Sequence, residues 1–193
     1  MKNCIVNGWI AGIYLNTGSG NILTGNTASG TNVGGQTGFD FISSSGNILI
    51  SNTASGNSYG FAFGAGSGNI LTSNTASGGK YYGFYFSSSS GNILTSNTAS
   101  GNTLAGFFLA SSSGNTLASN TASGNPGDGF DLNPLTSSNT LALNAANSNG
   151  GYGYHDLSSG AAGAPTYGTA NTYLANTDNG ANTLGASSPA GLG

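Results

Sequence analysis

A phrase of eleven residues, GNILTSNTASG, occurs twice in this chain without a change and three more times with one or two substitutions. The copies begin at Gly20, Gly46, Gly68, Gly91 and Gly114. The asparagine before each TAS triplet, or before its equivalent, marks the repeat at Asn3, Asn26, Asn52, Asn74, Asn97, Asn120 and Asn144. These anchors lie about 23 residues apart, and a fixed period of this length predicts a solenoid of stacked rungs.

Each repeat contains three short segments in which apolar and polar residues alternate. In the repeat that starts at Asn74 they are residues 74–77, 83–86 and 92–95, with the sequences NTAS, GFYF and NILT. Alternation with a period of two predicts β-strands, and the Gly, Ser and Asn residues between the segments predict turns. We therefore expect an all-β parallel solenoid with three strands per rung and roughly seven to eight rungs.

The alternation also predicts which side chains point into the coil. One column is leucine, one is alanine, and the third is mostly aromatic. The columns are Leu23, Leu49, Leu71, Leu94, Leu117 and Leu141; Ala28, Ala54, Ala76, Ala99, Ala122 and Ala146; and Ile13, Leu15, Phe39, Phe41, Phe61, Phe63, Phe84, Phe86, Phe107, Leu109, Phe130 and Leu132. Small residues opposite large ones allow a narrow coil to reach native packing density.

Two asparagine columns recur at the corners of the predicted rungs. Because stacked asparagine side chains hydrogen-bond to one another, both columns are predicted to form ladders. The columns are Asn21, Asn47, Asn69, Asn92, Asn115 and Asn139, and Asn26, Asn52, Asn74, Asn97, Asn120 and Asn144.

The pattern GNxLTxNTASGNxxxGFxF resembles the repeats of right-handed parallel β-helix proteins, the group with NosD-like and pectate-lyase-like repeats. The C-terminal stretch GTANTYLANTDNGANTLGASSPAGL resembles the closing segment of bacterial secreted members. The resemblance implies a right-handed β-helix and an extracellular or cell-surface location. It leaves function open, because this fold carries lyases, hydrolases, adhesins, ice-binding proteins and surface-layer proteins.

One continuous domain is expected, with β-helix repeats over 1–157 and degenerate repeats that form a C-terminal cap over 158–193. The N-terminal rung is expected to begin uncapped, because Asn3 and Cys4 start in the middle of a repeat. The chain is then expected to be either a fragment of a longer solenoid or one that stacks on a partner. Because an open strand edge is a template for another chain, self-association through this rung is predicted. Cys4 is predicted to occupy the outward position held by Thr27 in the next rung.

The composition of the chain argues against nucleic acid and membranes as binding partners. Only 4% of the residues are charged, there is no Arg or Glu, and the basic residues are Lys2 and Lys80. Nucleic acid binding needs clustered basic residues, so it is not expected. No apolar stretch is long enough for a membrane-spanning helix, so membrane insertion is not expected either. With a single cysteine, no intrachain disulfide is possible.

The strongest candidate for acid–base chemistry or metal binding is a cluster of Asp128, Asp131, His155 and Asp156. Asp131 and His155 are expected at outward positions of the same strand in adjacent rungs, within reach of each other. A carboxylate–imidazole pair suits proton transfer or metal ligation. The alternative is a solvent-facing pair without a function. No catalytic residue, metal or cofactor is therefore assigned from the sequence.

Two flat, uncharged outer faces are candidate binding surfaces. The face of the TAS strands presents Thr27, Ser29, Thr53, Ser55, Thr75, Ser77, Thr98, Ser100, Thr121 and Ser123. The face of the ILT strands presents Ile22, Thr24, Ile48, Ile50, Ile70, Thr72, Ile93 and Thr95. Ice-binding β-solenoids use such threonine grids, and the resemblance suggests ice as a ligand. The alternative is that β-branched residues simply suit exposed strands.

The outer side of the GFxF strands carries a mixed set of residues. It is expected to present Tyr14, Asp40, Ala62, Tyr85, Phe108, Asp131 and His155, with Tyr59, Tyr81 and Tyr82 in the adjoining turns. Aromatic side chains in such a place can stack on sugar rings. An ordinary exposed mixture of residue types is the alternative.

Three functions follow as hypotheses. The first is a non-catalytic extracellular β-solenoid with a structural, filament-forming or adhesive role. The second is an ice-binding protein, and the third is a carbohydrate-binding or polysaccharide-degrading module. The low charge and the absence of a clear catalytic constellation favour the first.

Overall fold

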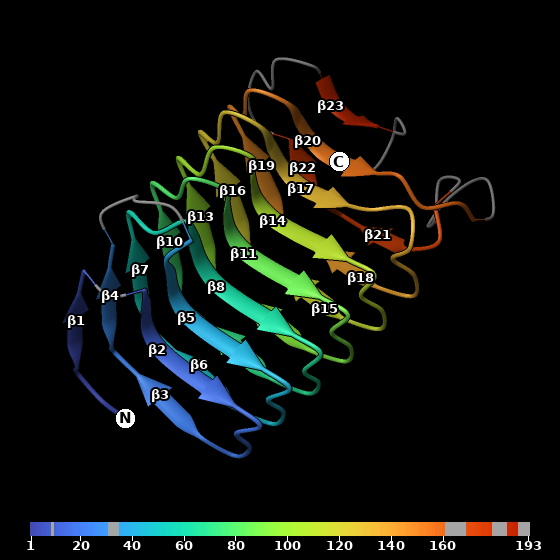
Figure 1. The fold of residues 1–193 in the computed structure, drawn as a ribbon. Coiled ribbons are helices and arrows are strands. Elements are labelled where there is room, and N and C mark those ends of the chain that lie inside the picture. The colour runs from blue at the N-terminus through green and yellow to red at the C-terminus, as the bar shows by residue number, and fades with distance from the viewer. Residues whose placement is uncertain (9, 31–34, 161–168, 179–184, 189–193) are drawn as a thin grey trace.

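The computed structural model describes residues 1–8, 10–30, 35–160, 169–178 and 185–188 of the 193-residue chain. Within them the chain forms an all-β, right-handed parallel β-helix, as predicted. The rungs follow one another in sequence order along the coil (Figure 1). The described residues include no apolar helix long enough to cross a lipid bilayer.

Three parallel sheets run along the coil, and each collects one kind of strand. The TAS sheet contains β1 (Ile5–Asn7), β4 (Thr27–Ser29), β7 (Thr53–Ser55), β10 (Thr75–Ser77), β13 (Thr98–Ser100), β16 (Thr121–Ser123), β19 (Ala145–Asn147) and β22 (Thr177–Asp178). The GFxF sheet contains β2 (Ala11–Asn16), β5 (Thr37–Ile42), β8 (Tyr59–Gly64), β11 (Tyr82–Ser87), β14 (Ala105–Ala110), β17 (Asp128–Leu132), β20 (Tyr152–Asp156) and β23 (Gly185–Ser188). The ILT sheet contains β3 (Ile22–Thr24), β6 (Ile48–Ile50), β9 (Ile70–Thr72), β12 (Ile93–Thr95), β15 (Thr116–Ala118), β18 (Thr140–Ala142) and β21 (Thr172–Leu174).

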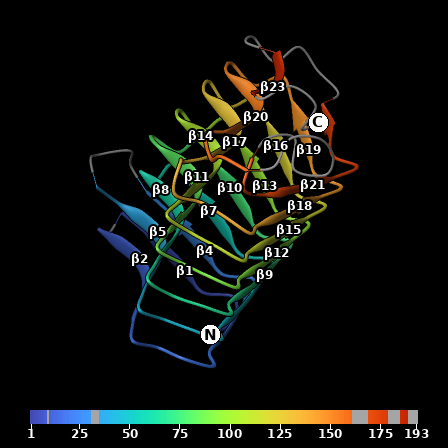
Figure 2. The ribbon, with the colours of Figure 1, turned by 90° about the vertical axis from the view of Figure 1, so that its right-hand side faces the viewer.

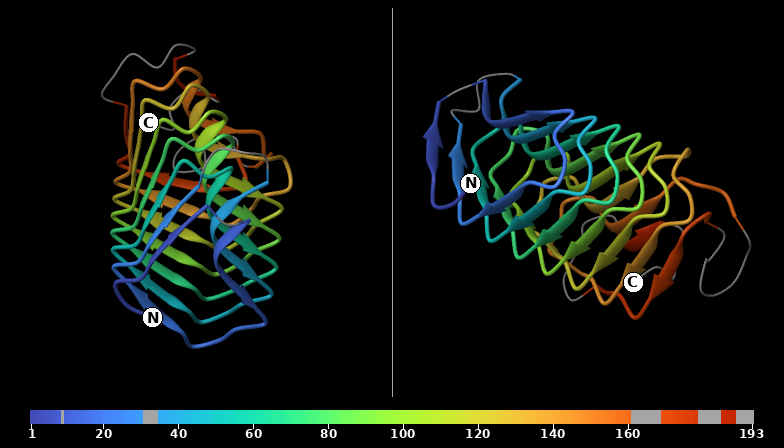
Figure 3. Two further views of the ribbon diagram at one scale, coloured as in Figure 1. Left: turned by 60° about the vertical axis from the view of Figure 1, so that its left-hand side comes forward. Right: turned by 90° about the horizontal axis from the view of Figure 1, so that it is seen from below.

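The strand register places like residues on one another. Leu94 pairs with Leu71 below and Leu117 above, and Thr75 pairs with Thr98. Figures 2 and 3 show the resulting stack of rungs from other sides. The repeated letters of the sequence therefore correspond to repeated positions in space, where each residue must fit on a copy of itself.

The predicted inward columns form the hydrophobic core. The leucine and alanine columns are buried throughout, and the aromatic column is buried from Phe39 onward. Its rings stack face to face: Phe84 and Phe107 have centroids 4.8 Å apart and planes inclined by 6°. Burial of such rings supplies the largest apolar area per residue in the coil.

Both predicted asparagine ladders are present, and all their predicted members except Asn21 are buried. Asn97 shows the pattern: its Nδ2 donates to the carbonyl of Leu71 at 2.9 Å and to Oδ1 of Asn120 at 3.0 Å. Its Oδ1 accepts the backbone N–H of Asn74 at 2.9 Å. Each ladder side chain thus satisfies backbone groups that the corner leaves unpaired. A shorter third ladder, not predicted, joins Asn102, Asn125 and Asn149.

The N-terminal rung is shifted by one residue from the predicted alignment. Ile5, and not Cys4, pairs with Thr27, so the prediction that Cys4 takes the outward threonine position is wrong. Cys4 instead lies at the place of the ladder asparagine, where its backbone N–H donates to Oδ1 of Asn26 at 3.0 Å. Asn3 has a φ of 52°, matching the left-handed φ of 65° at Gly25.

The segment after residue 157 extends the sheets of the coil where it is described. β21, β22 and β23 pair in parallel with β18, β19 and β20. Asn171 and Asn176 prolong the two long ladders by accepting from Asn139 and Asn144. Much of the low-complexity excursion, residues 161–168 with Pro165, lies outside the described residues, as does Pro189.

Candidate functional site

The outer surface of the GFxF sheet differs from the other two because a glycine precedes the first inward aromatic residue of each strand from β5 to β20. A Cβ on Gly83 would lie 2.7 Å from the carbonyl oxygen of Gly106 and 3.0 Å from Cβ of Ala99. No side chain fits there without displacing backbone. The glycine lets neighbouring rungs approach closely and leaves Tyr82 and Tyr85, on either side of it, part-exposed on the outside.

Five aromatic side chains gather on this surface and form what we call the aromatic strip: Tyr59, Tyr81, Tyr82, Tyr85 and Phe108. Ring centroids of Tyr82 and Phe108 are 4.5 Å apart with planes inclined by 20°, and those of Tyr85 and Phe108 are 5.8 Å apart. The ring centroid of Tyr59 lies 5.3 Å from those of both Tyr81 and Tyr85. The Tyr59 and Tyr82 side chains belong to β8 and β11, and not to turns as predicted.

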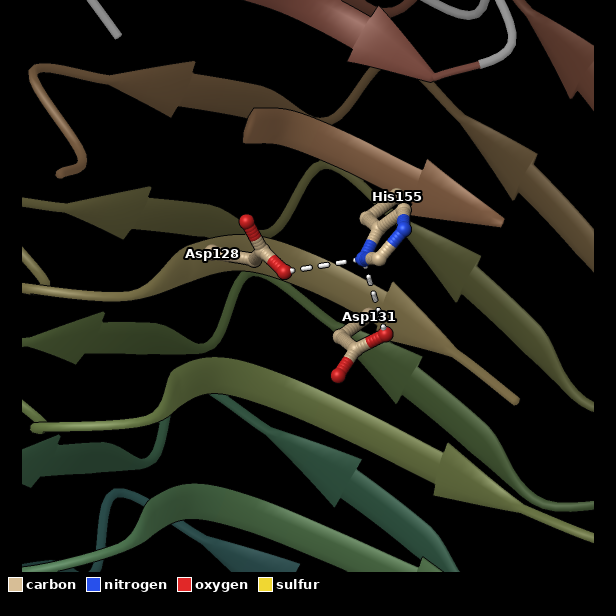
Figure 4. Close-up of side chains that lie close together, drawn as sticks. All are labelled: Asp128, Asp131 and His155. Atoms are coloured by element: carbon tan, nitrogen blue, oxygen red, sulfur yellow. Dashed lines mark hydrogen bonds and ion pairs between the residues drawn. The ribbon is translucent and has the colours of Figure 1, made fainter. Parts of the chain in front are cut away.

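Beside the strip lies the Asp–His cluster, which consists of Asp128 and Asp131 on β17 and His155 on β20 (Figure 4). Nδ1 of His155 is 3.0 Å from Oδ2 of Asp128 and 3.5 Å from Oδ1 of Asp131. Asp131 and His155 are direct partners in the strand register, as the sequence predicts. The three side chains are part-exposed and converge on one point outside the sheet.

The cluster and the strip share an electrostatic environment. Burial, followed by the charge of Asp128, raises the pKa of Asp131 to about 6, against a smaller lowering by His155. Burial and then the carboxylate of Asp131 raise the pKa of Tyr82 to about 12. Phe108 of the strip is the register partner of Asp131 on the neighbouring strand, so the strip and the cluster adjoin each other on the same sheet.

Asp156 does not belong to this cluster, so the predicted grouping of four residues is wrong. Alternation along β20 turns its side chain into the coil, where it is 3% exposed. Its carboxylate accepts hydrogen bonds from the backbone N–H and hydroxyl of Ser158, from Nδ2 of Asn171 and from the hydroxyl of Tyr173. It occupies the register position of Leu132 one rung earlier, at the end of the described core.

The two predicted flat faces are regular in space. On the TAS sheet the Thr and Ser columns stay in register from β4 through β16, and Oγ of Ser29 and Ser55 are 3.1 Å apart. On the ILT sheet the isoleucines stay in register from β3 through β12, and Ile22, Ile70 and Ile93 are exposed. Neither face carries a titratable side chain from β4 to β16 or from β3 to β12.

Sequence reasoning missed how closely the tyrosines of neighbouring rungs contact each other. It also missed Tyr152, whose ring centroid lies 5.2 Å from that of His155 and whose backbone N–H donates to Oδ1 of Asp128 at 2.6 Å. The period of the repeat contained the signal, because Tyr59, Tyr82 and Tyr152 fall in one column of the strand register with Ala105 and Asp128. No closed pocket forms among the described residues, so a ligand of this surface would lie on an open face.

A family model described as "Periplasmic copper-binding protein (NosD)" matches residues 2–181 of the chain. Among curated proteins, no sequence matches significantly. Solved structures with the same fold include the periplasmic alginate epimerase AlgG, with a TM-score of 0.72 and 18% identity over 94% of this chain. Another is the Dettilon tailspike protein, with a TM-score of 0.68 and 16% identity over 89% of this chain. The matches span 45% and 40% of those proteins, so this chain covers less than half of their length.

Proposed function

Because the chain belongs to the NosD family, a family of periplasmic proteins by its description, we propose that it is an exported β-helix protein that binds a polysaccharide along the outer face of the GFxF sheet. The observation that carries this proposal is the aromatic strip. Most exposed side chains of the chain are small and polar, yet five aromatic rings meet on one face across β8, β11 and β14.

The strip suits a sugar polymer for two reasons. Flat aromatic faces offer apolar area to the C–H faces of sugar rings, and tyrosine hydroxyl groups donate and accept hydrogen bonds at their edge. The strip is also open and spans three successive rungs, those of β8, β11 and β14, so a sugar chain can lie across them. Asp128, Asp131 and His155 at its end supply further hydrogen-bonding groups for sugar hydroxyls.

The charges of this face favour a neutral polysaccharide. Asp40, Asp128 and Asp131 lie on it, and the basic groups near it are His155 and Lys80, whose Nζ is 5.4 Å from the Tyr81 ring centroid. With a net charge of −3 and no arginine, the chain has little to neutralise a polyanion. The alginate epimerase shares the fold, but an acidic polymer such as alginate is disfavoured here.

The test is binding of untagged protein to neutral and acidic polysaccharides, measured by affinity electrophoresis and by pull-down on insoluble glucan and xylan. Tyr82→Ala and Phe108→Ala should each weaken binding at least about 10-fold, since each removes a stacking platform worth more than 1 kcal/mol. Tyr14→Ala is the matched control, because Tyr14 is an outward aromatic residue of the same sheet, 51% exposed, outside the strip. Equal binding by all three variants, or tighter binding to alginate than to any neutral polymer, would contradict the proposal.

Ice is a second candidate ligand, supported by the regular grid of Thr and Ser on the TAS sheet. Five successive rungs hold the grid in register without a charged side chain, with spacings of about 4.8 Å between strands. Thr75→Tyr and Thr98→Tyr should abolish inhibition of ice recrystallisation while the melting temperature of the protein is unchanged. Wild-type protein without any effect on ice growth would remove this candidate.

The structural, filament-forming or adhesive role, including self-association through the N-terminal rung, stays a prediction. Electron microscopy of native material would reveal filaments directly. Glycan binding and a structural role are compatible, since only one face of the coil is needed for binding.

The family description also names copper, and the donor atoms of this chain restrict what kind of copper site it can build. The chain has one Cys, one Met and one His, so it lacks the set of soft ligands that Cu(I) prefers. The nitrogen and two carboxylate oxygens of the Asp–His cluster fit Cu(II), which accepts mixed nitrogen and oxygen ligands. His155, Asp128 and Asp131 are the residues that would hold the ion.

A further inference from the structure

We propose that the Asp–His cluster is a binding site for a divalent transition-metal ion, with Nδ1 of His155, Oδ2 of Asp128 and Oδ1 of Asp131 as the protein ligands. The proposal goes beyond glycan binding and does not depend on it, because the three ligands lie together on β17 and β20 whether or not the aromatic strip binds a sugar.

The distances between the ligand atoms allow all three to bind one metal ion. One potential ligand atom from each residue lies within 4.8 Å of the other two. Nδ1 is 3.0 Å from the Asp128 oxygen and 3.5 Å from the Asp131 oxygen. Atoms bound at about 2.0–2.2 Å to one ion lie about 3 Å apart in adjacent square or octahedral positions and slightly farther apart in tetrahedral ones. Both distances from Nδ1 fall in this range before any rearrangement.

The surroundings hold these side chains in place. The backbone N–H of Tyr152 donates to Oδ1 of Asp128 at 2.6 Å, which directs Oδ2 of the same carboxylate toward His155. The Tyr152 ring packs at 5.2 Å against the imidazole. Hydrogen bonds and packing of this kind fix ligand orientation in metal sites. The side chains are 24%, 17% and 21% exposed for His155, Asp128 and Asp131, so water can complete the coordination of an ion from outside.

The charge balance of the cluster also favours a cation. Two carboxylates, those of Asp128 and Asp131, face a single imidazole. In the metal-free protein the short Nδ1–Oδ2 contact is a hydrogen bond, so a proton occupies the place between the ligands. A divalent ion takes the place of this proton, which is released to solvent, and it neutralises both carboxylates at once.

The donor set predicts the order of affinities. For a site with an imidazole nitrogen and two carboxylate oxygens, the affinity for Cu²⁺ is generally higher than that for Zn²⁺, and the affinity for Ni²⁺ is higher than that for Mn²⁺. Ca²⁺ prefers six or more oxygen ligands and should bind weakly. We therefore expect Cu²⁺ to bind most tightly, with Zn²⁺ next among the ions tested.

Isothermal titration of untagged protein with CuCl₂ and with ZnCl₂ at pH 7, together with electron paramagnetic resonance of the Cu²⁺ form, tests the site. Because the free α-amino group of Met1 also binds Cu²⁺, the protein is used with an acetylated N-terminus. One equivalent should bind, with a spectrum that shows a single coordinated nitrogen. His155→Gln and Asp131→Asn should each lower the affinity at least about 10-fold, and His155→Gln should abolish the nitrogen coupling.

Asp40→Asn is the matched control, since Asp40 is an outward carboxyl of the same sheet in the column of Asp131 and His155 but several rungs away. It should bind Cu²⁺ like wild type. Circular dichroism establishes that each variant is folded. Absence of saturable binding in the wild type, or unchanged affinity and nitrogen coupling in folded His155→Gln, overturns the proposal. A wild type that binds metal but no glycan upholds this site and removes the proposed function.

Discussion

At the scale of single residues, the corner between the ILT and TAS strands is the most demanding position of the rung. Its backbone is left-handed in every described rung, at Asn3, Gly25, Ser51, Ser73, Ser96, Ser119, Leu143 and Ala175. Leu143 is the bulkiest of them, with a φ of 56° and 64% of its surface exposed. A left-handed conformation costs an ordinary residue about 1–2 kcal/mol, and glycine escapes most of this cost.

Leu143→Gly should therefore stabilise the protein by about 0.5–1 kcal/mol, since the strain relieved exceeds the extra entropy of glycine in the unfolded chain. Urea unfolding followed by circular dichroism measures the change. Leu135→Gly is the control, because Leu135 is an exposed leucine without positive φ, and its replacement should give no gain. An unfolding free energy that falls in Leu143→Gly would show that its side chain, and not its backbone, matters.

Asp131 gives the second prediction at this scale. Its pKa is raised from 3.8 to about 6, so between these values the folded protein binds more protons than the unfolded chain. The stability linked to this proton is present below pH 4 and is lost as the pH rises through 6. Asp131→Asn imitates the neutral side chain, so its stability relative to wild type should increase from pH 4 to pH 7.

Chemical unfolding at pH 4, 5, 6 and 7 with EDTA present measures this difference. The comparison is repeated in a His155→Gln background, which removes the imidazole 3.5 Å from Oδ1 of Asp131, and the trend should persist there. A stability difference that stays constant from pH 4 to pH 7 would contradict the raised pKa.

At the scale of elements, each strand of the GFxF sheet has two unlike faces. β14 places Phe107 inside, stacked between Phe84 and Phe130, and Phe108 outside in the aromatic strip. Phe107→Ala should lower the unfolding free energy by about 3–5 kcal/mol, because it leaves a cavity in the aromatic column. Phe108→Ala should change stability by less than about 1.5 kcal/mol and act on ligand binding instead.

Thermal and urea unfolding of the Phe107→Ala and Phe108→Ala variants measures how much each side chain contributes to stability. A similar loss in both variants would mean that the strip stabilises the fold as much as the core does. The glycan-binding proposal would then lose its main support, since the strip would have a structural explanation.

The elements also show where sequence reasoning succeeded. The Leu, Ala and Phe columns, the two long asparagine ladders and the pairing of Asp131 with His155 follow from period and alternation alone. When equivalent residues of successive repeats stack on one another, the position of a residue within its repeat determines its position in space. Alternation along residues 153–156 also predicts that Asp156 points inward. The predicted grouping of Asp156 with Asp128, Asp131 and His155 follows their proximity in sequence and ignores this alternation. The sequence did not reveal the one-residue shift of the first rung, because Cys4 stands where each of the later repeats has its anchoring asparagine.

The cross-rung contacts of the aromatic strip could not be predicted in the same way. Residue types change irregularly along its columns, from Tyr85 to Phe108 to Asp131. Ring orientations depend on the neighbours that happen to stand above and below. Period and alternation give the column of a side chain, whereas its contacts with unlike neighbours require coordinates.

At the scale of the whole molecule, the coil is a stack of nearly equivalent units. Deletion of residues 68–90, one rung from Gly68 to the residue before Gly91, joins two positions that are equivalent in the repeat. The shortened chain should still fold cooperatively, with lower stability because one interface between rungs is lost. Circular dichroism and size-exclusion chromatography test this expectation.

Deletion of residues 68–78 alone is the control. It removes eleven residues, less than half a rung, including β9 and β10, so the rungs before and after the deletion no longer match in register. This variant should not fold. Folding of the half-rung variant would mean that stacking of identical positions is not what specifies the coil.

The asparagine ladders give the molecule a direction. From Asn21 to Asn171, every side-chain amide of the first ladder turns its NH₂ toward the next rung and its oxygen toward the previous one. Dipoles aligned head to tail add, so the partial positive pole of this row lies at its C-terminal end. Among the described residues, the NH₂ group at that end is on Asn171, and it donates to the carboxylate of Asp156 at 2.9 Å. A coil almost without charged residues thus contains a row of aligned amide dipoles, and in the part of the chain that the structure describes the positive end of this row meets a buried carboxylate.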